Sequence, residues 1–441
     1  MFNIPVQRIE QHFSVLGKIG NLGSFREAGF LRASWSDEET AAMEYVKNVG
    51  WESGLRASYD GIGNLYLTTP QPRDAQEVVQ VASHLDTVPY GGLFDGAAGV
   101  MAGLEAIIAL REAWPMFKRK LQLVIWRGEE SATFGAVCKG SRAAFGRNNR
   151  NIVLKKFEGR TLEQAIRSQG FDPSFIENST PTLSPERIDA IAAYLELHIE
   201  QATKLEVDGN DIGIVTSVRG TRRFRFVVTG EAAHSGGTPM GLAYRKDANL
   251  AIAYMQVELD ALGKQALADG HDLVQTVGLL NSDRDYNMFN PRLYENAMTK
   301  VSPYGYFTLD IRSNNRAFLD AYAAKVQTLM QTVCKRLRVF VEITKVGALE
   351  PIEEMDQPLQ LALEKSCRYL QYNYEFMPSG AIHDVAIVAS QPRSNGTTIP
   401  SALVFIPCRH GISHNPKEYT TTDAMHKGAM VLAQTMYEIA S

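Results

Sequence analysis

The chain has 441 residues, more than one hydrophobic core usually organises, so its length predicts two domains. Hydrophobic residues make up 45% of the chain and charged residues 21%, which is typical of a soluble globular protein. The formal net charge of -4 provides no basic surface for nucleic acid or an anionic membrane, so neither is expected as a partner.

Targeting signals are not evident. The N-terminal residues MFNIPVQRIEQHF lack the basic and apolar segments of a signal peptide, and no apolar run reaches the roughly 18 residues of a membrane span. The cysteines lack CxxC spacing, which favours free thiols in a reducing cytoplasm. They are Cys138, Cys334, Cys367 and Cys408.

Helix and then short strands are predicted at the start of the chain. Residues 1–50 have a helical pattern, with Ser36 and Glu39 as a capping box. Strands at 55–60 and 64–70 follow, on either side of a glycine-containing turn.

The stretch 77–110 carries the first candidate ligands. EVVQVA predicts a buried strand with His84 at its carboxyl end, where open α/β sheets place their chemistry. Asp86 points the same way while the strand persists, and would hold the second nitrogen of a metal-bound imidazole. Asp95 begins an apolar helix at 97–110 and suits a carboxylate that bridges two cations.

Two further predicted strands, LQLVIWRGEE and AYLELHIEQ, also end in polar side chains of the metal-ligand type. Strands that alternate with helices predict an α/β domain with a mixed, mostly parallel sheet flanked by helices. The side chains at these two strand ends are Glu129, Glu130, His198, Glu200 and Gln201.

The pattern changes after about residue 214. From 215 to 347 the order is strand, helix, strand, strand, helix, strand, which predicts a compact α+β unit of βαββαβ type with both helices on one face. We therefore expect a catalytic domain made of residues 1–214 and 348–441, with the βαββαβ unit inserted into it.

Five side chains form a constellation typical of a two-metal hydrolytic site. Two imidazoles on one cation, a third imidazole on the other and a shared aspartate would leave open positions for water and substrate. Glu129, which lies next to a candidate ligand, is suited to act as general base and then as general acid. The five candidate ligands are His84, Asp95, Glu130, His198 and His414.

Seven motifs support a family resemblance. They are SHLDTVPYGGLFDG, the EE pair, LELHIEQ, GEAAHSGGTPM, TLDIRS, SGAIHD and GISHNPKE. In this order and spacing the chain resembles the N-carbamoyl-L-amino-acid hydrolase, allantoate amidohydrolase and β-ureidopropionase family, part of the dinuclear-metal aminoacylase and carboxypeptidase superfamily. The resemblance covers nearly the whole chain.

The resemblance implies two divalent ions per chain, zinc or manganese, with cobalt and nickel also compatible with these ligands. It implies that His84 and His198 bind separate ions, that Asp95 bridges them, and that Glu130 and His414 complete the pair. It also implies that Glu129 is the base, that Asp86 orients His84, and that the inserted domain is a lid and a homodimer interface. The side chains implied to face a small-molecule carboxylate substrate are Gln201, His234, Arg312 and His383.

Some substrate positions depart from the family pattern. Thr133 stands where the family has an arginine, Thr299 or Lys300 would replace a substrate-binding asparagine, and Ile382 replaces a glycine. Because the metal ligands are retained while these positions differ, we expect hydrolysis with altered specificity.

The expected reaction is cleavage of the amide or ureido C–N bond of an N-carbamoyl amino acid or a related carboxylate. Two alternatives stay open: an N-acyl-amino-acid or conjugate hydrolase, or dipeptidase, of the same superfamily, and a catalytically silent binding protein. His12, His271 and His410 belong to no motif and are expected on the surface.

Overall fold

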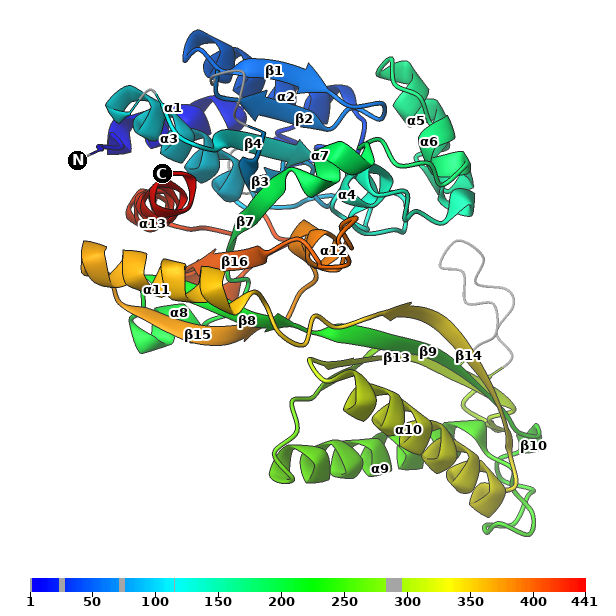
Figure 1. The fold of residues 1–441 in the computed structure, drawn as a ribbon. Helices are drawn as coiled ribbons and strands as arrows, with labels where there is room; N and C mark the ends of the chain where they lie inside the picture. Colours follow the sequence, from blue (N-terminus) through cyan, green and yellow to red (C-terminus); the bar gives the residue numbers. More distant parts are fainter. Residues whose placement is uncertain (1, 24–27, 71–75, 115, 283–295) are drawn as a thin grey trace. The chain divides into compact units, whose positions relative to one another are not determined.

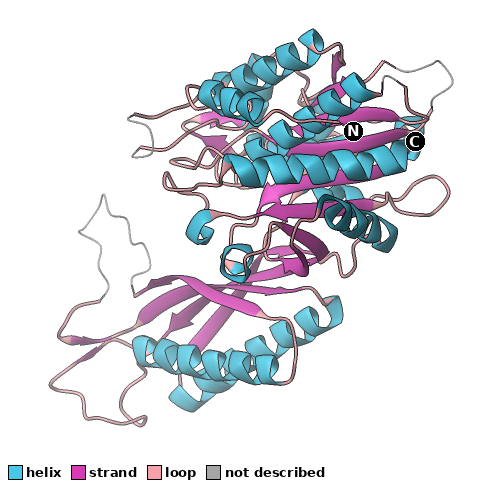
Figure 2. Ribbon diagram, turned by 90° about the vertical axis from the view of Figure 1, so that its left-hand side faces the viewer, coloured by secondary structure: helices cyan, strands magenta, loops and turns pink. Residues whose placement is uncertain are grey.

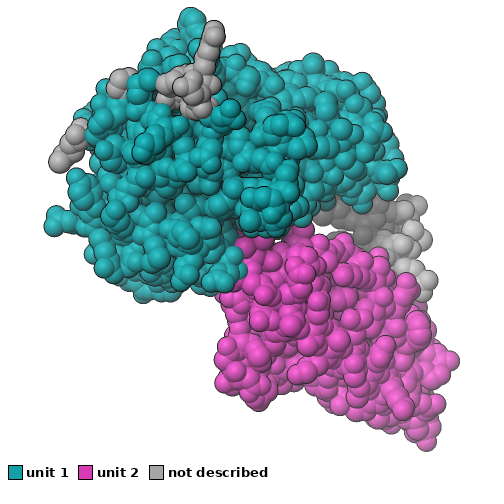
Figure 3. All heavy atoms as spheres, viewed as in Figure 1, with its two compact units in different colours: residues 1–216, 354–441 teal, residues 217–353 magenta. Residues whose placement is uncertain are grey.

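The protein forms two compact units (Figure 3). Each unit has its own hydrophobic core. Unit 1 comprises Met1–Thr216 and Glu354–Ser441, and unit 2 comprises Ser217–Glu353. The structure, a computed structural model, describes residues 2–23, 28–70, 76–114, 116–282 and 296–441.

Unit 1 is built on an eight-stranded mixed sheet (Figure 1). In spatial order its strands are β1 (Arg56–Tyr59), β2 (Leu65–Thr68), β4 (Lys120–Trp126), β3 (Val78–His84), β7 (Ile191–Ile199), β16 (Ser401–Ile406), β8 (Ile212–Val218) and β15 (Tyr374–Ser379). The central strands β4, β3, β7 and β16 run parallel, whereas β1–β2, β2–β4 and β16–β8 are antiparallel pairs. The central strands are almost wholly buried, as expected for parallel strands flanked by helices.

The main core of unit 1 lies between this sheet and five helices, α1 (Val6–Leu16), α2 (Asp37–Glu52), α3 (Ala97–Ala113), α11 (Gln357–Leu370) and α13 (Thr422–Ala440). α3 is apolar on all sides and packs against β3, β4 and β7, so its first turn meets the sheet next to the strand ends. The other α-helices of this unit are α4 (Lys139–Ala144), α5 (Leu162–Ser168), α6 (Ser174–Glu177), α7 (Pro185–Asp189), α8 (Lys204–Asp208) and α12 (Asp384–Ala389).

Unit 2 contains a four-stranded antiparallel sheet with two long helices on one face (Figure 2). Its strands, in spatial order, are β11 (Val274–Asn281), β13 (Tyr304–Ser313), β9 (Gly220–Thr229) and β14 (Phe340–Leu349), and its helices are α9 (Ala248–Ala268) and α10 (Arg316–Leu337). Phe224, Phe226 and Val228 alternate along β9 and are buried in the core with both helices, whereas Arg225 and Val227 between them are only half-buried. The short strand β10 (Ala233–His234) pairs with β12 (Lys300–Val301).

Several local predictions were wrong. Residues 1–50 are not one helical region, because the described residues between α1 and α2 form turns and bridges around positive-φ Gly20. Ser36 caps α2 as predicted, but the Glu39 carboxylate does not return to Ser36 and instead accepts the N–H of Trp35 at 2.6 Å. β4 ends at Trp126, so the two glutamates follow the strand in a loop.

His12 is also not on the surface. It is 4% exposed, and its Nε2 lies 2.8 Å from Oε1 of the fully buried Glu105, which joins α1 to α3. His271 and His410 are exposed as predicted. Among the described residues, no helix has both the length and the apolar character needed to cross a membrane.

Candidate metal centre

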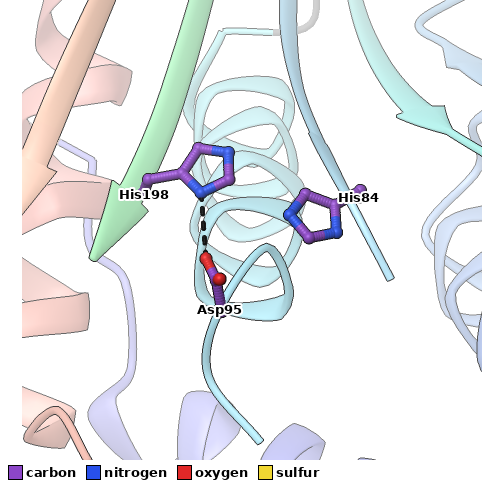
Figure 4. A group of neighbouring side chains, drawn as sticks. All are labelled: His84, Asp95 and His198. Atoms are coloured by element: carbon purple, nitrogen blue, oxygen red, sulfur yellow. Dashed lines mark hydrogen bonds and ion pairs between the residues drawn. The ribbon is translucent and has the colours of Figure 1, made fainter. Parts of the chain in front are cut away.

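Neighbouring parallel strands bring two of the predicted ligands to one edge of the sheet. His84 is the last residue of β3, His198 is the last but one of β7, and their ring centroids are 5.2 Å apart. Asp95 precedes α3, and its Oδ1 lies 3.2 Å from Nδ1 of His198 (Figure 4). One ligand atom from each of these three residues lies within 4.8 Å of the others, close enough for a shared cation.

A second group shares Asp95. His414, in the loop before α13, places its Nε2 3.3 Å from Asp95 Oδ2 and 3.0 Å from Glu130 Oε1. Asp95 therefore directs one carboxylate oxygen to His198 and the other to His414. This is the geometry that a carboxylate needs to bridge two cations.

The grouping of the ligands differs in one detail from what the resemblance implied. His84 and His198 lie in the same ligand group, not on opposite sides of Asp95. The cause is strand order, because β3 and β7 are adjacent in the sheet and their carboxyl ends coincide. Among the described residues a third group, Glu196, His198 and His383, shares His198 with the first.

The charges at the centre fit a cationic ligand. Burial opposes protonation of His84, yet Glu129, Asp86 and Asp95 raise the pKa of its imidazole well above the ordinary value. Hydrogen bonds with Asp95 and Glu130 raise the pKa of His414 to about 11. Burial likewise opposes protonation of His198, but Asp95 and Glu196 raise the pKa of its imidazole to about 9. The buried carboxylates are therefore stable as anions only with positive charge nearby. Divalent cations bound to neutral imidazoles would supply that charge.

Asp86 connects the first histidine to the glutamate pair. Its Oδ1 lies 3.3 Å from His84 Nδ1 and accepts the N–H of Glu129 at 3.0 Å, while its Oδ2 accepts the N–H of Glu130 at 3.1 Å. Ser34 donates its hydroxyl to Asp86 at 3.0 Å. One buried carboxylate therefore orients the imidazole and fixes the loop after β4.

Glu129 has the environment of a proton acceptor. Its side chain is almost fully buried, with Oε2 3.9 Å from His84 Nε2, and it belongs to none of the ligand groups found among the described residues. Burial raises the pKa of Glu129 well above its ordinary value; His84 opposes this change, and Glu130 and Asp384 add to it. A raised pKa favours proton uptake by this carboxylate, as a general base requires.

Two of the predicted substrate residues lie in unit 1 beside the ligands. Gln201 donates its side-chain N–H to Asp95 Oδ2 at 2.7 Å and holds φ of 59°. His383 is 2% exposed and lies against His198, with ring centroids 4.1 Å apart. Its Nε2 is buried without a hydrogen-bond partner among the described residues.

The other two predicted substrate residues belong to unit 2. His234 lies in β10 and accepts the N–H of Gly237 through Nδ1 at 3.0 Å. Arg312 lies in β13 and donates to Asp310 from Nε at 3.1 Å and from Nη2 at 2.8 Å.

Sequence reasoning missed several buried charged residues around the centre, among them Glu196 and Lys139. Glu196 places Oε1 3.0 Å from His198 Nε2 and accepts the hydroxyl of Tyr194 at 2.8 Å. Its position two residues before His198 on the same strand was the available signal, because alternate strand residues share a face. Lys139 is fully buried and donates to the carbonyl of Glu130 at 2.7 Å, a contact that no sequence spacing reveals.

Comparisons with known proteins agree with this geometry. Residues 81–438 match Peptidase family M20/M25/M40. The chain is 33% identical to an allantoate amidohydrolase of Escherichia coli (strain K12), with 96% of each chain covered, and 30% identical to an N-carbamoyl-L-amino acid amidohydrolase of Geobacillus stearothermophilus, with 99% of each covered. A hydantoinase/carbamoylase family amidase from Burkholderia multivorans superposes with a TM-score of 0.84 at 26% identity, covering 100% of this chain and 98% of that chain.

These matches confirm the family resemblance and the mixed α/β fold class predicted from the sequence. They also confirm the predicted class of enzyme, a hydrolase acting on linear amide bonds. Metal dependence follows from the family together with the candidate ligand groups. The chain therefore belongs to Peptidase family M20/M25/M40, as a metal-dependent hydrolase.

Proposed function

We propose that this chain is a dinuclear amidohydrolase that cleaves the amide or ureido C–N bond of an N-carbamoyl amino acid or a related small carboxylate such as allantoate. The observation that carries the proposal is Asp95, whose two oxygens face His198 on one side and His414 on the other. The full-length similarity to amidohydrolases of allantoate and N-carbamoyl-L-amino acids supports the substrate class.

Two cations would be held by two ligand sets that share Asp95. One set is His84, Asp95 and His198, and the other is Asp95, Glu130 and His414. When bound, the cations would polarise the scissile carbonyl and lower the pKa of the attacking water. Zinc and manganese suit this mixture of imidazole and carboxylate best, and cobalt or nickel is also compatible with it.

Proton transfer is assigned to Glu129. It would take the proton of the attacking water and return it to the leaving nitrogen, and the raised pKa of this buried carboxylate favours the uptake of that proton. Asp86 would serve this step indirectly, because it holds His84 in place and accepts the backbone N–H of Glu129.

Four side chains would orient the substrate. Arg312 would bind the carboxylate, for which a guanidinium is well shaped, and Gln201 and His383 would contact the substrate beside the ions. His234 would donate to the oxyanion that develops at the scissile carbonyl. Unit 2 would act as a lid and as the interface of a homodimer, and we place the enzyme in the cytoplasm.

The test is amine release by metal-reconstituted enzyme across N-carbamoyl amino acids, allantoate, N-acyl amino acids and dipeptides. We expect carbamoyl or ureido substrates to react fastest, and Glu129→Gln to lose at least ~100-fold in kcat while it retains its metal content. Preference for N-acyl amino acids or dipeptides would replace the proposed substrate class and favour the alternative hydrolase. Absence of both metal binding and turnover would favour the silent binding protein.

Dimer function has its own test. Neither His234→Ala nor Glu129→Gln alone should be active. If His234 serves the partner's site, a mixture of the two variants should regain part of the activity, because some mixed dimers then contain one intact site. No regain in mixed dimers would place His234 in the site of its own chain.

A further inference from the structure

Glu418 is a buried carboxylate that connects two segments carrying metal ligands. It is 4% exposed and lies between the His414 loop and α13. Its Oε1 accepts the backbone N–H groups of Phe94 and Asp95, both at 2.9 Å. Its Oε2 accepts the hydroxyl of Ser413 at 3.0 Å and the backbone N–H of His414 at 3.3 Å.

We propose that Glu418 is a positioning residue, which holds the Asp95 and His414 segments at a fixed separation and thereby sets the affinity for the cation that those two side chains share. The inference rests on the proposed function, because it assumes a cation between Asp95 and His414. Glu418 itself is not a ligand in this proposal, because its oxygens are engaged with donors of the protein.

The two segments need such a connection. Asp95 and His414 are 319 residues apart in the chain, and neither lies within a helix or strand. His414 has the most exposed side chain of the five proposed ligands, 49% exposed, and holds φ of 55°. His84 and His198, by contrast, are fixed by hydrogen-bonded strands. The Glu418 carboxylate would hold Asp95 and His414 in place, as β3 and β7 do for the other two histidines.

Close packing at Gly92 supports the same role. A Cβ at Gly92 would lie 2.1 Å from Oε1 of Glu418, so only glycine allows the turn before Asp95 to lie this close to the carboxylate. Ser413 adds a further link, because its hydroxyl also lies within 3.5 Å of Asp95 Oδ2. The separation of the two segments is thus determined by direct contacts at Glu418.

The experiment is a Zn²⁺ titration of metal-free protein against a chromophoric chelator, with Co²⁺ absorption as a second readout of ligand geometry. Glu418→Gln keeps the shape but turns one acceptor oxygen into a donor that faces other donors. We expect its affinity for the ion shared by Asp95 and His414 to fall about 10- to 100-fold. Its Co²⁺ spectrum should change, and kcat should recover towards the wild-type value at saturating metal.

Glu105→Gln is the matched control. Glu105 is also a fully buried carboxylate of unit 1, but it binds Arg8 and His12 and contacts neither ligand segment. We expect this variant to lose thermal stability while its affinity for Zn²⁺ stays at the wild-type value. The comparison separates a general loss of stability from a specific loss at the ligands.

Two further variants decide the question if Glu418→Gln does not fold. Ser413→Ala removes one of the four donors, and Gly92→Ala displaces the carboxylate without changing its charge; both should weaken Zn²⁺ binding. Wild-type affinity in every folded variant at Glu418, Ser413 and Gly92 would overturn the positioning role alone. A wild-type protein that binds no divalent cation would overturn the proposed function, and this inference with it.

Discussion

Replacement of Gly99 by alanine tests whether the distance between α3 and the sheet sets the geometry of the centre. Gly99 lies in the first turn of α3, and an added Cβ would lie 1.9 Å from the carbonyl oxygen of Leu197 and 2.7 Å from Oγ of Ser83. A carbon needs about 3.3 Å to a carbonyl oxygen, so the start of the helix must retreat by about 1.4 Å. Asp95, which directly precedes α3, would move with it.

The expected losses follow from this displacement. A misplacement of about 1 Å can cost about 100-fold in rate, or about 2.7 kcal/mol of transition-state stabilisation. Overpacking should also lower the free energy of unfolding by about 1–3 kcal/mol. The assays are kcat/KM on the best substrate and thermal unfolding of the metal-loaded protein.

Gly103→Ala is the control on the same helix. Its Cβ would lie 3.0 Å from the methyl carbons of Val81 and 3.1 Å from Leu123 Cδ1, which are side-chain ends that can shift. Because alanine favours the helix over glycine by about 1 kcal/mol, which offsets the crowding, we expect a net loss of less than about 1 kcal/mol and activity within about threefold of wild type. A folded Gly99→Ala protein with activity equally close to wild type would refute the reasoning.

Three other substitutions probe the surroundings of the centre. Glu196→Gln should weaken Zn²⁺ binding about 10- to 100-fold, because it loosens His198, and unchanged affinity in the titration would count against that role. Glu39→Ala removes the carboxylate that lies 2.8 Å from the fully buried guanidinium of Arg127. The free energy of unfolding, measured by chemical denaturation, should therefore fall by about 3–5 kcal/mol. A fall of less than about 1 kcal/mol would mean that water reaches the guanidinium. Arg312→Lys should raise KM more than it lowers kcat, because lysine cannot bind a carboxylate bidentately, and an unaltered KM would remove Arg312 from substrate binding.

Much of the architecture could be predicted because it depends on local patterns. The continuous apolar runs at β3, β4 and β7 indicate buried parallel strands, and each run is followed by polar side chains at the carboxyl end. The change to alternation along β9 marks the start of the antiparallel unit. The α1 stripe of Ile9, Phe13 and Leu16 includes His12 at helical spacing, so its burial could also have been inferred.

The remaining features depend on contacts between distant parts of the chain. No spacing in the sequence shows that β3 lies beside β7, and this adjacency is what places His84 and His198 in one ligand group. The sequence alone pairs Glu39 with Ser36 in a capping box, because its actual partner Arg127 lies 88 residues further along the chain. The burial of Lys139 could not be predicted from sequence periodicity, because it depends on the particular backbone oxygen that the ammonium group reaches.

The position of β16 has a consequence for the order in which the two units fold during synthesis. β16 comes from the last quarter of the chain, yet it is an interior strand of the unit 1 sheet, between β7 and β8. During synthesis, unit 2 can therefore fold before β16 has been made, while β7 is still unpaired on the side where β16 will bind. A nascent chain that stops before β16 also lacks His414, so a chain cannot complete its set of proposed ligands before its sheet is complete.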